Sequence, residues 1–275
     1  MLRQVYYALP PNLRFLARRL YYAPTDMLDR LRGKRDDLTP PKGLIFTGSG
    51  DFKAQGQKLL GYFQEIGGLQ PDHQVLDIGS GIGRIAVPLT TFLNTEGGYE
   101  GFDVVELGVK WCQNRISTRF PNFNFRYIPL DNDLYKSGGN NAANFQFPYS
   151  DQSFDFVILT SVFTHMLPDE VANYLKEIRR VLKPNGTCFA TFFIWNEKSA
   201  QLSASNPAFQ FPYDYGGYRL MDEVVKSANV AYEETELQRL VASAKLTTQQ
   251  CHYGFWCGRP KEQCKDFQDI LILKK

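Results

Sequence analysis

The sequence has few of the residues that build a disulfide framework or a metal site. Its 275 residues include five cysteines and three histidines. The cysteines are odd in number and form no CxxC pair, which predicts free thiols in a reducing compartment, and we therefore expect a cytoplasmic protein. No His, Asp and Glu residues cluster at metal-ligand spacing, so no metal is expected.

Long apolar runs are also missing, so we expect no transmembrane segment. Pro10, Pro11 and Arg14 interrupt the first residues before a signal-peptide core could form. The formal net charge is only +2, which gives no electrostatic reason to expect a nucleic-acid partner.

Basic residues gather at the N-terminus, where residues 1–42 hold nine Lys or Arg against four Asp. Tyr, Phe and Leu alternate with these arginines, and we expect residues 1–50 to form a basic, aromatic arm or cap. The favoured interpretation is a cap over the active site with a solvated basic face. The alternative is a basic amphipathic helix within residues 1–35 that contacts a membrane surface or a carrier protein. Nothing in the sequence indicates which oligomeric state the protein adopts.

From about residue 51 to residue 275, strand-like and helix-like segments alternate, which is typical of a mainly parallel sheet covered by helices. The expected strands are 74–78, 99–104, 123–130, 154–160, 187–194, 246–255 and 267–273, the last two forming a terminal hairpin. The expected helices are 51–66, one from about 83, 106–120, 168–182 and 232–244. Residues 132–144 are expected to form a surface loop.

A glycine-rich segment, VLDIGSGIGR at 75–84, separates the first strand from its helix. Glycines at 79, 81 and 83 let the backbone turn sharply and approach a ligand, and the next helix offers free N–H groups. Asp77 precedes the glycines, and Asp103 ends the next strand, where a carboxylate suits the two ribose hydroxyls of an adenosine. The alternatives are a purely structural turn or an NAD(P) site, but Arg84 and Ile85 stand where the dinucleotide pattern wants its last glycine.

The sequence resembles the class I S-adenosylmethionine-dependent methyltransferases over about residues 50–195. The motifs are VLDIGSGIGR, GFDVV, FPYSDQSFDFVILTSVFTHM and EIRRVLKPNGTCFATFF, in the family's order. The resemblance implies an α/β, Rossmann-like, doubly wound and mostly parallel seven-stranded sheet with a terminal antiparallel hairpin strand. It also implies S-adenosylmethionine as the cofactor.

The same resemblance implies a set of cofactor-binding residues. In the glycine loop they are Asp77, Gly79, Ser80, Gly81, Gly83 and Arg84, and after the later strands they are Asp103, Val104, Asp131, Thr160 and Ser161. Asp103 would hold the ribose, with Val104 beside the adenine. Asp131 stands near the family's adenine-edge position, although a long Asn-rich loop replaces the usual short link there. Thr160 and Ser161 would face the sulfonium and its methyl group.

An oxygen nucleophile gains from a base whose pKa is near neutrality. His165 follows the fourth expected strand, on the side of the sheet where ligands bind. We expect it to be the catalytic base, with substrate or cofactor positioning and a structural role as alternatives. His73 is expected at the surface, and His252 within the terminal hairpin.

Acceptor specificity is expected in segments outside the shared core. Residues 195–220 would form an aromatic lid that contacts the substrate through Phe209, Phe211, Tyr213, Tyr215 and Tyr218. The alternative is a segment that packs on itself. Tyr253 and Trp256 form a second candidate substrate-binding cluster, which core packing explains equally well. The segment from Phe46 to Phe52 is expected to close over the cofactor.

These expectations favour O-methylation of a hydroxyl on a small or medium-sized molecule, such as a sugar, a lipid or a secondary metabolite, by in-line displacement. The rivals are a small-molecule N-methyltransferase, a non-catalytic S-adenosylmethionine-binding protein and an NAD(P)-dependent oxidoreductase. A nucleic-acid substrate is not expected, because the chain has no Asn/Asp-Pro-Pro-Tyr/Phe motif.

Overall fold

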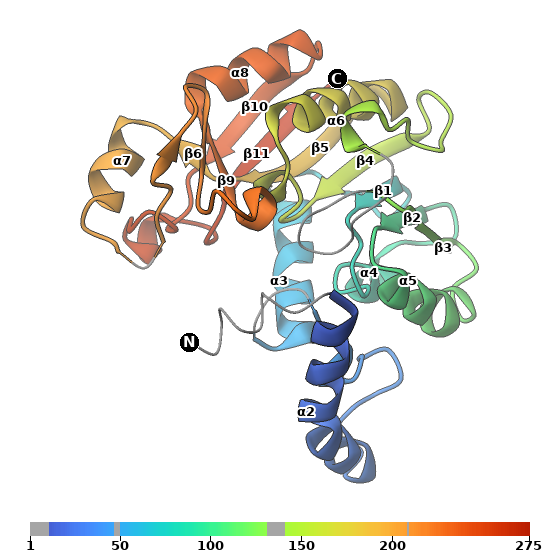
Figure 1. The fold of residues 1–275 in the computed structure, drawn as a ribbon. Coiled ribbons are helices and arrows are strands. Elements are labelled where there is room, and N and C mark those ends of the chain that lie inside the picture. Colours follow the sequence, from blue (N-terminus) through green and yellow to red (C-terminus); the bar gives the residue numbers. More distant parts are fainter. Residues whose placement is uncertain (1–10, 47–49, 131–140, 208) are drawn as a thin grey trace.

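A seven-stranded sheet forms the centre of the protein, as the computed structural model shows for residues 11–46, 50–130, 141–207 and 209–275 (Figure 1). The strand order is β10-β11-β5-β4-β1-β2-β3; β11 runs antiparallel to both of its neighbours, β10 and β5, and the other neighbouring strands are parallel. The strands are β1 (Gln74–Ile78), β2 (Gly98–Asp103), β3 (Phe123–Tyr127), β4 (Phe154–Leu159), β5 (Leu182–Phe192), β10 (Thr247–His252) and β11 (Asp269–Lys274). The predicted fold class and the terminal hairpin are therefore confirmed.

Helices cover both faces of this sheet because its strands are apolar on both sides. In β4, Val157 and Leu159 face one hydrophobic core, whereas Phe156 and Ile158 face the other. The first core is shared with α6 (Pro168–Val181) and α8 (Glu234–Ser243). The second is shared with α3 (Phe52–Glu65), α4 (Ala86–Phe92) and α5 (Glu106–Cys112).

Several element boundaries differ from the sequence expectation for local reasons. The helix expected from about residue 83 begins at Ala86, because Gly83 has a left-handed φ of 82° that an α-helix excludes. The strand expected over 123–130 ends at Tyr127. The helix expected over 106–120 changes after Cys112 into a π-helical turn, Gln113–Ser117.

The segment expected to be an aromatic lid forms regular structure of its own. A second, four-stranded sheet has the order β6-β9-β8-β7 and lies beside α7 (Glu197–Ser203) (Figure 1). Its strands are β6 (Ile194–Trp195), β7 (Tyr213–Asp214), β8 (Tyr218–Leu220) and β9 (Val230–Glu233). Because β9 occupies residues 230–233, the helix expected from residue 232 starts two residues later, at Glu234.

The N-terminal arm contains a long helix, α2 (Pro11–Leu31), which extends away from the two sheets (Figure 1). The turn η1 (Lys42–Leu44) packs against it. The carboxylate of Asp26 accepts hydrogen bonds from the backbone N–H groups of Lys42 (2.7 Å) and Gly43 (3.0 Å). Gly43 permits this close packing, because a Cβ there would lie 3.0 Å from the Cα of Arg19.

Candidate functional site

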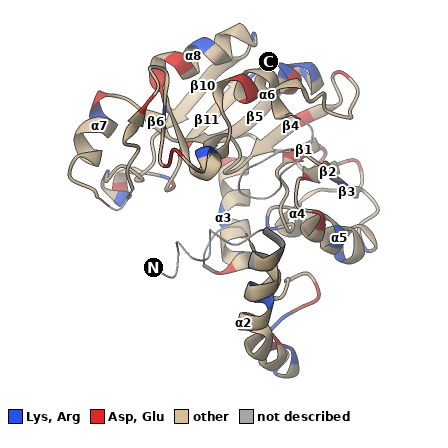
Figure 2. Cartoon of the chain, viewed as in Figure 1, with Lys and Arg blue, Asp and Glu red and all other residues tan. Residues whose placement is uncertain are grey.

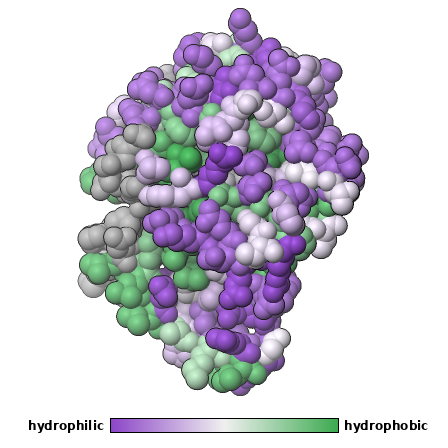
Figure 3. Space-filling view, turned by 90° about the vertical axis from the view of Figure 1, so that its right-hand side faces the viewer, coloured by the Kyte–Doolittle hydropathy of each residue, from purple (hydrophilic) through white to green (hydrophobic). Residues whose placement is uncertain are grey.

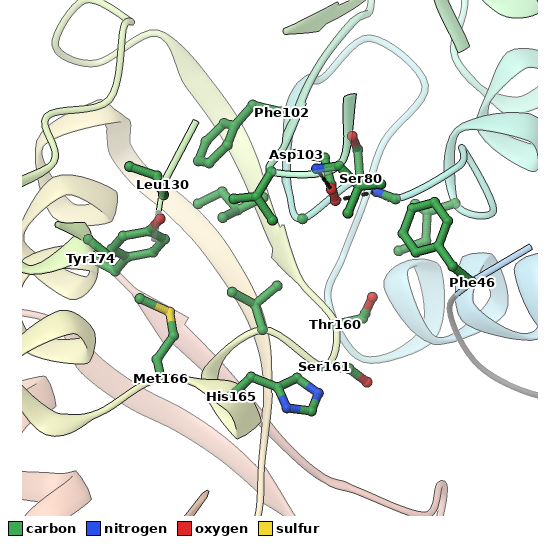
Figure 4. A pocket seen from close by; sticks show the side chains of 18 of the residues that line it. Phe46, Ser80, Phe102, Asp103, Leu130, Thr160, Ser161, His165, Met166 and Tyr174 are labelled. Carbon is green, nitrogen blue, oxygen red and sulfur yellow. Dashed lines mark hydrogen bonds between the residues drawn. The ribbon is translucent and has the colours of Figure 1, made fainter. Parts of the chain in front are cut away.

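A cavity of about 280 Å³ opens at the carboxyl ends of β1, β2 and β4 (Figure 4). β1 lies between β2 and β4 in the sheet. The connection after β1 therefore leads to one side of this strand, and the later connection to β4 crosses to its other side. Such a switch point leaves a crevice between the loops, and this is where ligands bind in open α/β sheets. The cavity is therefore the candidate active site.

The glycine loop after β1 forms one wall of the cavity. Gly79, Gly81 and Gly83 all have positive φ, at 77°, 58° and 82°. A Cβ on Gly79 would lie 2.5 Å from Cγ2 of Val162, and one on Gly83 would lie 2.9 Å from Cδ1 of Ile116. Glycine is thus required at these two positions both by backbone conformation and by close packing. Gly79, Ser80, Gly81 and Arg84 line the cavity, whereas Gly83 packs against Ile116 and Cys112 and is not among the lining residues.

Asp103 ends β2 and holds the loop from the side (Figure 4). Its Oδ2 accepts a hydrogen bond from the N–H of Gly81 at 2.7 Å, and its Oδ1 accepts one from the N–H of Val105 at 2.7 Å. Burial raises the pKa of this carboxyl to about 6, although the backbone donors favour the charged form. The side chain borders the cavity and keeps lone pairs for further donors.

Asp77 lies beneath the loop and is fully buried. The hydroxyl of Tyr99 donates to its Oδ2 at 2.6 Å. Burial raises the pKa of Asp77 to about 7. The folded, ligand-free protein therefore holds protons on Asp77 and Asp103 that the unfolded chain releases, and its stability falls as the pH rises from about 4 to about 7.

Two buried oxygens at this loop have no hydrogen-bond partner among the described residues, namely Oδ1 of Asp77 and Oγ of Ser80. Buried polar groups in folded proteins are normally paired. An unpaired carboxylate oxygen beside an unpaired hydroxyl suits a ligand group that donates hydrogen bonds and carries positive charge. The residues present thus fit an adenosine-type cofactor with a cationic amino-acid group.

Ser161 follows β4 in a conformation that is unusual for a residue with a side chain. Its φ is 58°, its N–H donates to Oγ1 of Thr191 at 2.8 Å, and its Oγ donates to Oε1 of Gln268 at 3.0 Å. These two bonds hold a strained backbone in place, which is common where a chain must aim groups at a ligand. Thr160 and Ser161 both line the cavity.

His165 lies across the cavity from Asp103, on the short turn η4 (Phe163–His165) (Figure 4). Its Nδ1 donates to the carbonyl oxygen of Ser227 at 2.8 Å. This bond fixes the proton on Nδ1, so Nε2 carries the free lone pair. Burial lowers the pKa of His165 below its ordinary value. The imidazole is therefore neutral at neutral pH and able to accept a proton.

The cavity has further walls that the sequence interpretation did not single out. They consist of Phe102, Leu130, Ala142, Met166, Glu170 and Tyr174. Glu170 and Tyr174 occupy neighbouring turns of α6, which starts three residues after His165. Their i, i+4 spacing, shortly after His165, places them on one face of the helix, and this is the sequence signal that could have identified them. Phe46, from the segment expected to close over the cofactor, does line the cavity.

None of the described cavity-lining residues comes from the proposed aromatic lid. Phe209, Phe211 and Trp256 pack instead around Phe193, in a core of their own beneath the second sheet. The physical reason is that burying large aromatic rings against one another in a hydrophobic core lowers the free energy more than leaving them partly exposed at the rim of a cavity. This packing favours the alternative of a segment that packs on itself, and the lid stays a prediction.

The remaining aromatic candidates lie at the surface of this second region. Tyr213 and Tyr215 are exposed, and Tyr215 stacks on Tyr218 with ring centroids 5.1 Å apart. Tyr253 donates a hydrogen bond to Glu234 and carries the guanidinium of Arg259 over its ring. None of these tyrosines lines the cavity.

Of the other predicted site residues, some line the cavity and others lie elsewhere. Val104 and Arg84 line the cavity. Asp131 lies outside the described residues. His252 is on β10, with Nε2 at 2.9 Å from Oε1 of Gln250, and His73 lies in the turn before β1. Among the described residues, no group of three or more His, Cys, Asp or Glu side chains is arranged to hold a metal ion.

Comparison with known proteins places the motifs in a family. Residues 76–190 match the model of a family described as a methyltransferase domain. The chain is 26% identical over 139 residues to the tRNA N(3)-cytidine methyltransferase METTL2 of Gallus gallus, a match that covers 47% of this chain and 33% of that protein. It is 27% identical over 141 residues to the ubiquinone/menaquinone biosynthesis C-methyltransferase UbiE of Wigglesworthia glossinidia brevipalpis, covering 51% and 46%. The chain thus spans less than half the length of each relative.

A solved structure extends the similarity of fold to nearly the whole chain. The S-adenosylmethionine-dependent methyltransferase from Clostridium acetobutylicum ATCC 824 superposes with a TM-score of 0.53 at 13% identity, over 93% of this chain and 98% of that one. At this identity the likeness shows the fold alone. Fold, motifs and family match together make the resemblance found in the sequence a firm one.

Proposed function

We propose that this protein, which carries a class I S-adenosylmethionine-dependent methyltransferase domain, transfers the cofactor's methyl group to a hydroxyl oxygen of a small or medium-sized acceptor. One observation carries the proposal: the glycine loop, Asp103 and a neutral, anchored His165 all line a single cavity. The second wall of that cavity, from Met166 to Tyr174, is where an acceptor would lie.

The loop side of the cavity is proposed to hold the cofactor. Asp103 would accept hydrogen bonds from its ribose hydroxyls, and Val104 and Leu130 would contact its adenine. Asp77 and Ser80, whose oxygens lack partners among the described residues, would receive its polar amino-acid end. Asp131 remains a proposed contact to the adenine edge. When bound, the cofactor supplies an activated methyl group on a sulfonium.

His165 is proposed to act as the base. Its Nε2 would take the proton of the acceptor hydroxyl as that oxygen bonds to the methyl carbon, while the electrons of the breaking C–S bond remain on sulfur. Ser227 keeps the imidazole oriented through the 2.8 Å bond to Nδ1. Thr160 and Ser161, fixed after β4, would align the reacting atoms and exclude water.

The acceptor is proposed to be a small molecule, not a nucleic acid, since the cavity is enclosed by apolar side chains such as Phe102, Met166 and Tyr174. A cytoplasmic location is supported by five cysteines that are all free. N-methylation is the second candidate, because the carboxylate of Glu170 lines the acceptor side and could bind an amine.

The direct test is a screen for S-adenosylhomocysteine release with the purified full chain. The panel should contain matched pairs of a hydroxyl compound, its O-methyl ether and the corresponding amine. Turnover of hydroxyl compounds alone supports O-methylation, and turnover of amines alone replaces it with the second candidate. Tight binding of NADH with no binding of S-adenosylhomocysteine in calorimetry would overturn the cofactor assignment as well.

Replacing His165 separates its roles as base and as structural anchor. His165→Asn keeps a donor for the carbonyl of Ser227 but removes the base, whereas His165→Ala removes both. We expect both variants to lose about 100-fold in kcat, at the lower end of what general bases contribute. In the wild type, kcat should fall toward acid pH with a midpoint below the ordinary 6.5 of histidine, because burial lowers this pKa.

The control for this experiment is calorimetric binding of S-adenosylhomocysteine, which both variants should retain. If His165→Asn restores wild-type kcat, the residue is a structural anchor and not a base. A kcat that falls toward acid pH in the same way in His165→Asn as in the wild type would also exclude it, because the variant has no imidazole to titrate.

A second prediction follows from the buried carboxylates beside the loop. Below their pKa values of about 7 and about 6, Asp77 and Asp103 hold protons in the free protein. A cationic ligand favours their ionised forms, so its binding must release protons. We therefore expect the affinity for S-adenosylmethionine to rise from about pH 5 to about pH 8, and the affinity for uncharged-sulfur S-adenosylhomocysteine to rise less.

Calorimetry in buffers of different ionisation enthalpy measures this proton release. Asp77→Asn keeps the shape of the side chain and an acceptor for Tyr99, so it serves as the matched variant. It should flatten the pH dependence of cofactor affinity. An affinity independent of pH in the wild type would contradict a cationic ligand at these carboxylates.

A further inference from the structure

Helix α2 turns its polar side toward the protein. The half-buried positions along it are Phe15, Arg18, Tyr22, Asp26 and Asp29, which repeat every three or four residues on one face. Asp26 caps the backbone of η1, and Asp29 pairs with Lys42 at 2.8 Å. The packed face of the helix thus holds both of its aspartates, and the cap over the active site stays a prediction.

The opposite face of α2 is apolar and points into solvent. Leu13, Leu16, Leu20, Met27 and Leu31 lie along it, each with 49–73% of its surface exposed. Leu28 and Tyr21 widen this stripe. Figure 3 shows apolar residues at the lower end of the molecule, where α2 lies in Figure 1. We call these seven residues the α2 stripe. Seven large apolar side chains along one helix face mark a contact surface.

Two arginines border the α2 stripe, Arg19 and Arg30, and neither forms an ion pair with an acidic side chain among the described residues. Arg19 and Arg30 are exposed at one border, and Arg32 follows the end of the helix. Figure 2 shows basic positions on α2 and at its far end. The two aspartates of the helix are both occupied on the packed face. The exposed face therefore carries positive charge that is not neutralised.

We propose that the α2 stripe docks this protein on an anionic lipid surface, with the helix lying in the plane of the interface. Apolar side chains would enter the acyl boundary, while the arginines at the border extend to lipid phosphates. In the described chain no helix combines the length and apolar character needed to cross a bilayer, so the contact is with one surface. A second copy of the chain is disfavoured, because pairing two such stripes would bring arginine against arginine.

The α2 stripe is connected to the candidate active site through an aromatic contact. Phe15, on the packed face of α2, meets the ring of Phe46 edge-on with centroids 5.6 Å apart, and Phe46 lines the cavity. Docking would thus hold a wall of the cavity close to the membrane. The docking itself does not depend on the proposed methyl transfer, and the two can fail separately.

Vesicle flotation with the full chain tests the inference. The probes are vesicles of phosphatidylcholine alone and vesicles that also contain phosphatidylglycerol. The stripe variant combines Leu16→Gln, Leu20→Gln and Met27→Gln, and the charge variant combines Arg19→Gln and Arg30→Gln. Val224→Gln is the matched control, because Val224 is 90% exposed on a different part of the surface.

Wild type and Val224→Gln should bind the anionic vesicles, and binding should weaken with added salt. The stripe variant should lose binding, and the charge variant should lose about fivefold in partition coefficient per arginine. All variants should bind S-adenosylhomocysteine equally, which separates docking from the proposed function. No binding of wild type to anionic vesicles would overturn the inference. So would a dimer in sedimentation that only the stripe variant dissociates, which would identify a second copy as the partner.

Discussion

Replacement of Asp103 by alanine is expected to weaken binding of S-adenosylhomocysteine by a factor of about 10² to 10⁴. The proposed ribose contacts are two hydrogen bonds to an ionised carboxylate, each contributing about 1.5–3 kcal/mol, and about 1.4 kcal/mol corresponds to a factor of ten. The variant also frees the N–H groups of Gly81 and Val105, which Asp103 now holds at 2.7 Å each. The variant therefore loses both the support of the glycine loop and the proposed contact to the ligand.

Calorimetry on two further variants tells these effects apart. Asp103→Asn preserves size but sets an amide N–H₂ against one of the two backbone donors, so it should also bind weakly. Glu100→Ala, on the same strand, removes a carboxylate that pairs with Arg126 away from the cavity and should bind normally. An Asp103→Ala variant with wild-type affinity would mean that Asp103 only shapes the loop.

Much of the sheet and of the cofactor side could be predicted because their signals are local. A buried strand, three glycines at alternate positions and a helix follow one another within residues 74–92, and each step has one physical explanation. Asp103 was identified by the same logic, since parallel strands bring their carboxyl ends to one edge. His165 was found because it follows β4 at that edge.

The second sheet could not be predicted because its strands are too short to show a period. β6 and β7 have two residues each, and β8 has three. Phe211 looked like a lid residue because its buried partners, Phe193 and Trp256, lie in other segments of the chain. For α2, the sequence shows two faces but not which one the protein covers. The packed face is identified in the structure by Asp26 and Asp29, whose carboxylates bond to residues of η1.

Asp269 belongs to no sequence motif, yet it joins the second sheet to the first. It starts β11 and is 1% exposed. Its Oδ2 accepts hydrogen bonds from the N–H of Ile194 (2.6 Å) and from Nε1 of Trp256 (2.8 Å), and its Oδ1 accepts one from the N–H of Gly254 (2.6 Å). One carboxylate therefore connects β11, β6 and the aromatic core.

Asp269→Ala is expected to lower the free energy of unfolding by about 3 kcal/mol at neutral pH. Leaving three buried donors without an acceptor costs about 1–3 kcal/mol each. Against this, burial raises the pKa of Asp269 to about 6, so removing the charge relieves about 3 kcal/mol at pH 7. The orphaned donors outweigh that relief. Urea denaturation followed by tryptophan fluorescence measures the difference.

The loss should grow as the pH falls from about 7 to about 4. Folded wild type keeps a proton on Asp269 up to about pH 6, whereas the unfolded chain releases it near 4, so this group stabilises the wild type at low pH and the alanine variant lacks that gain. The matched control is Asp155→Ala, whose carboxylate bonds to the N–H of Gln74 and to Lys183 but is 26% exposed. Water can replace those partners, so we expect a loss of only about 1 kcal/mol. Equal losses in both variants would mean that Asp269 contributes no more than a partly exposed ion pair.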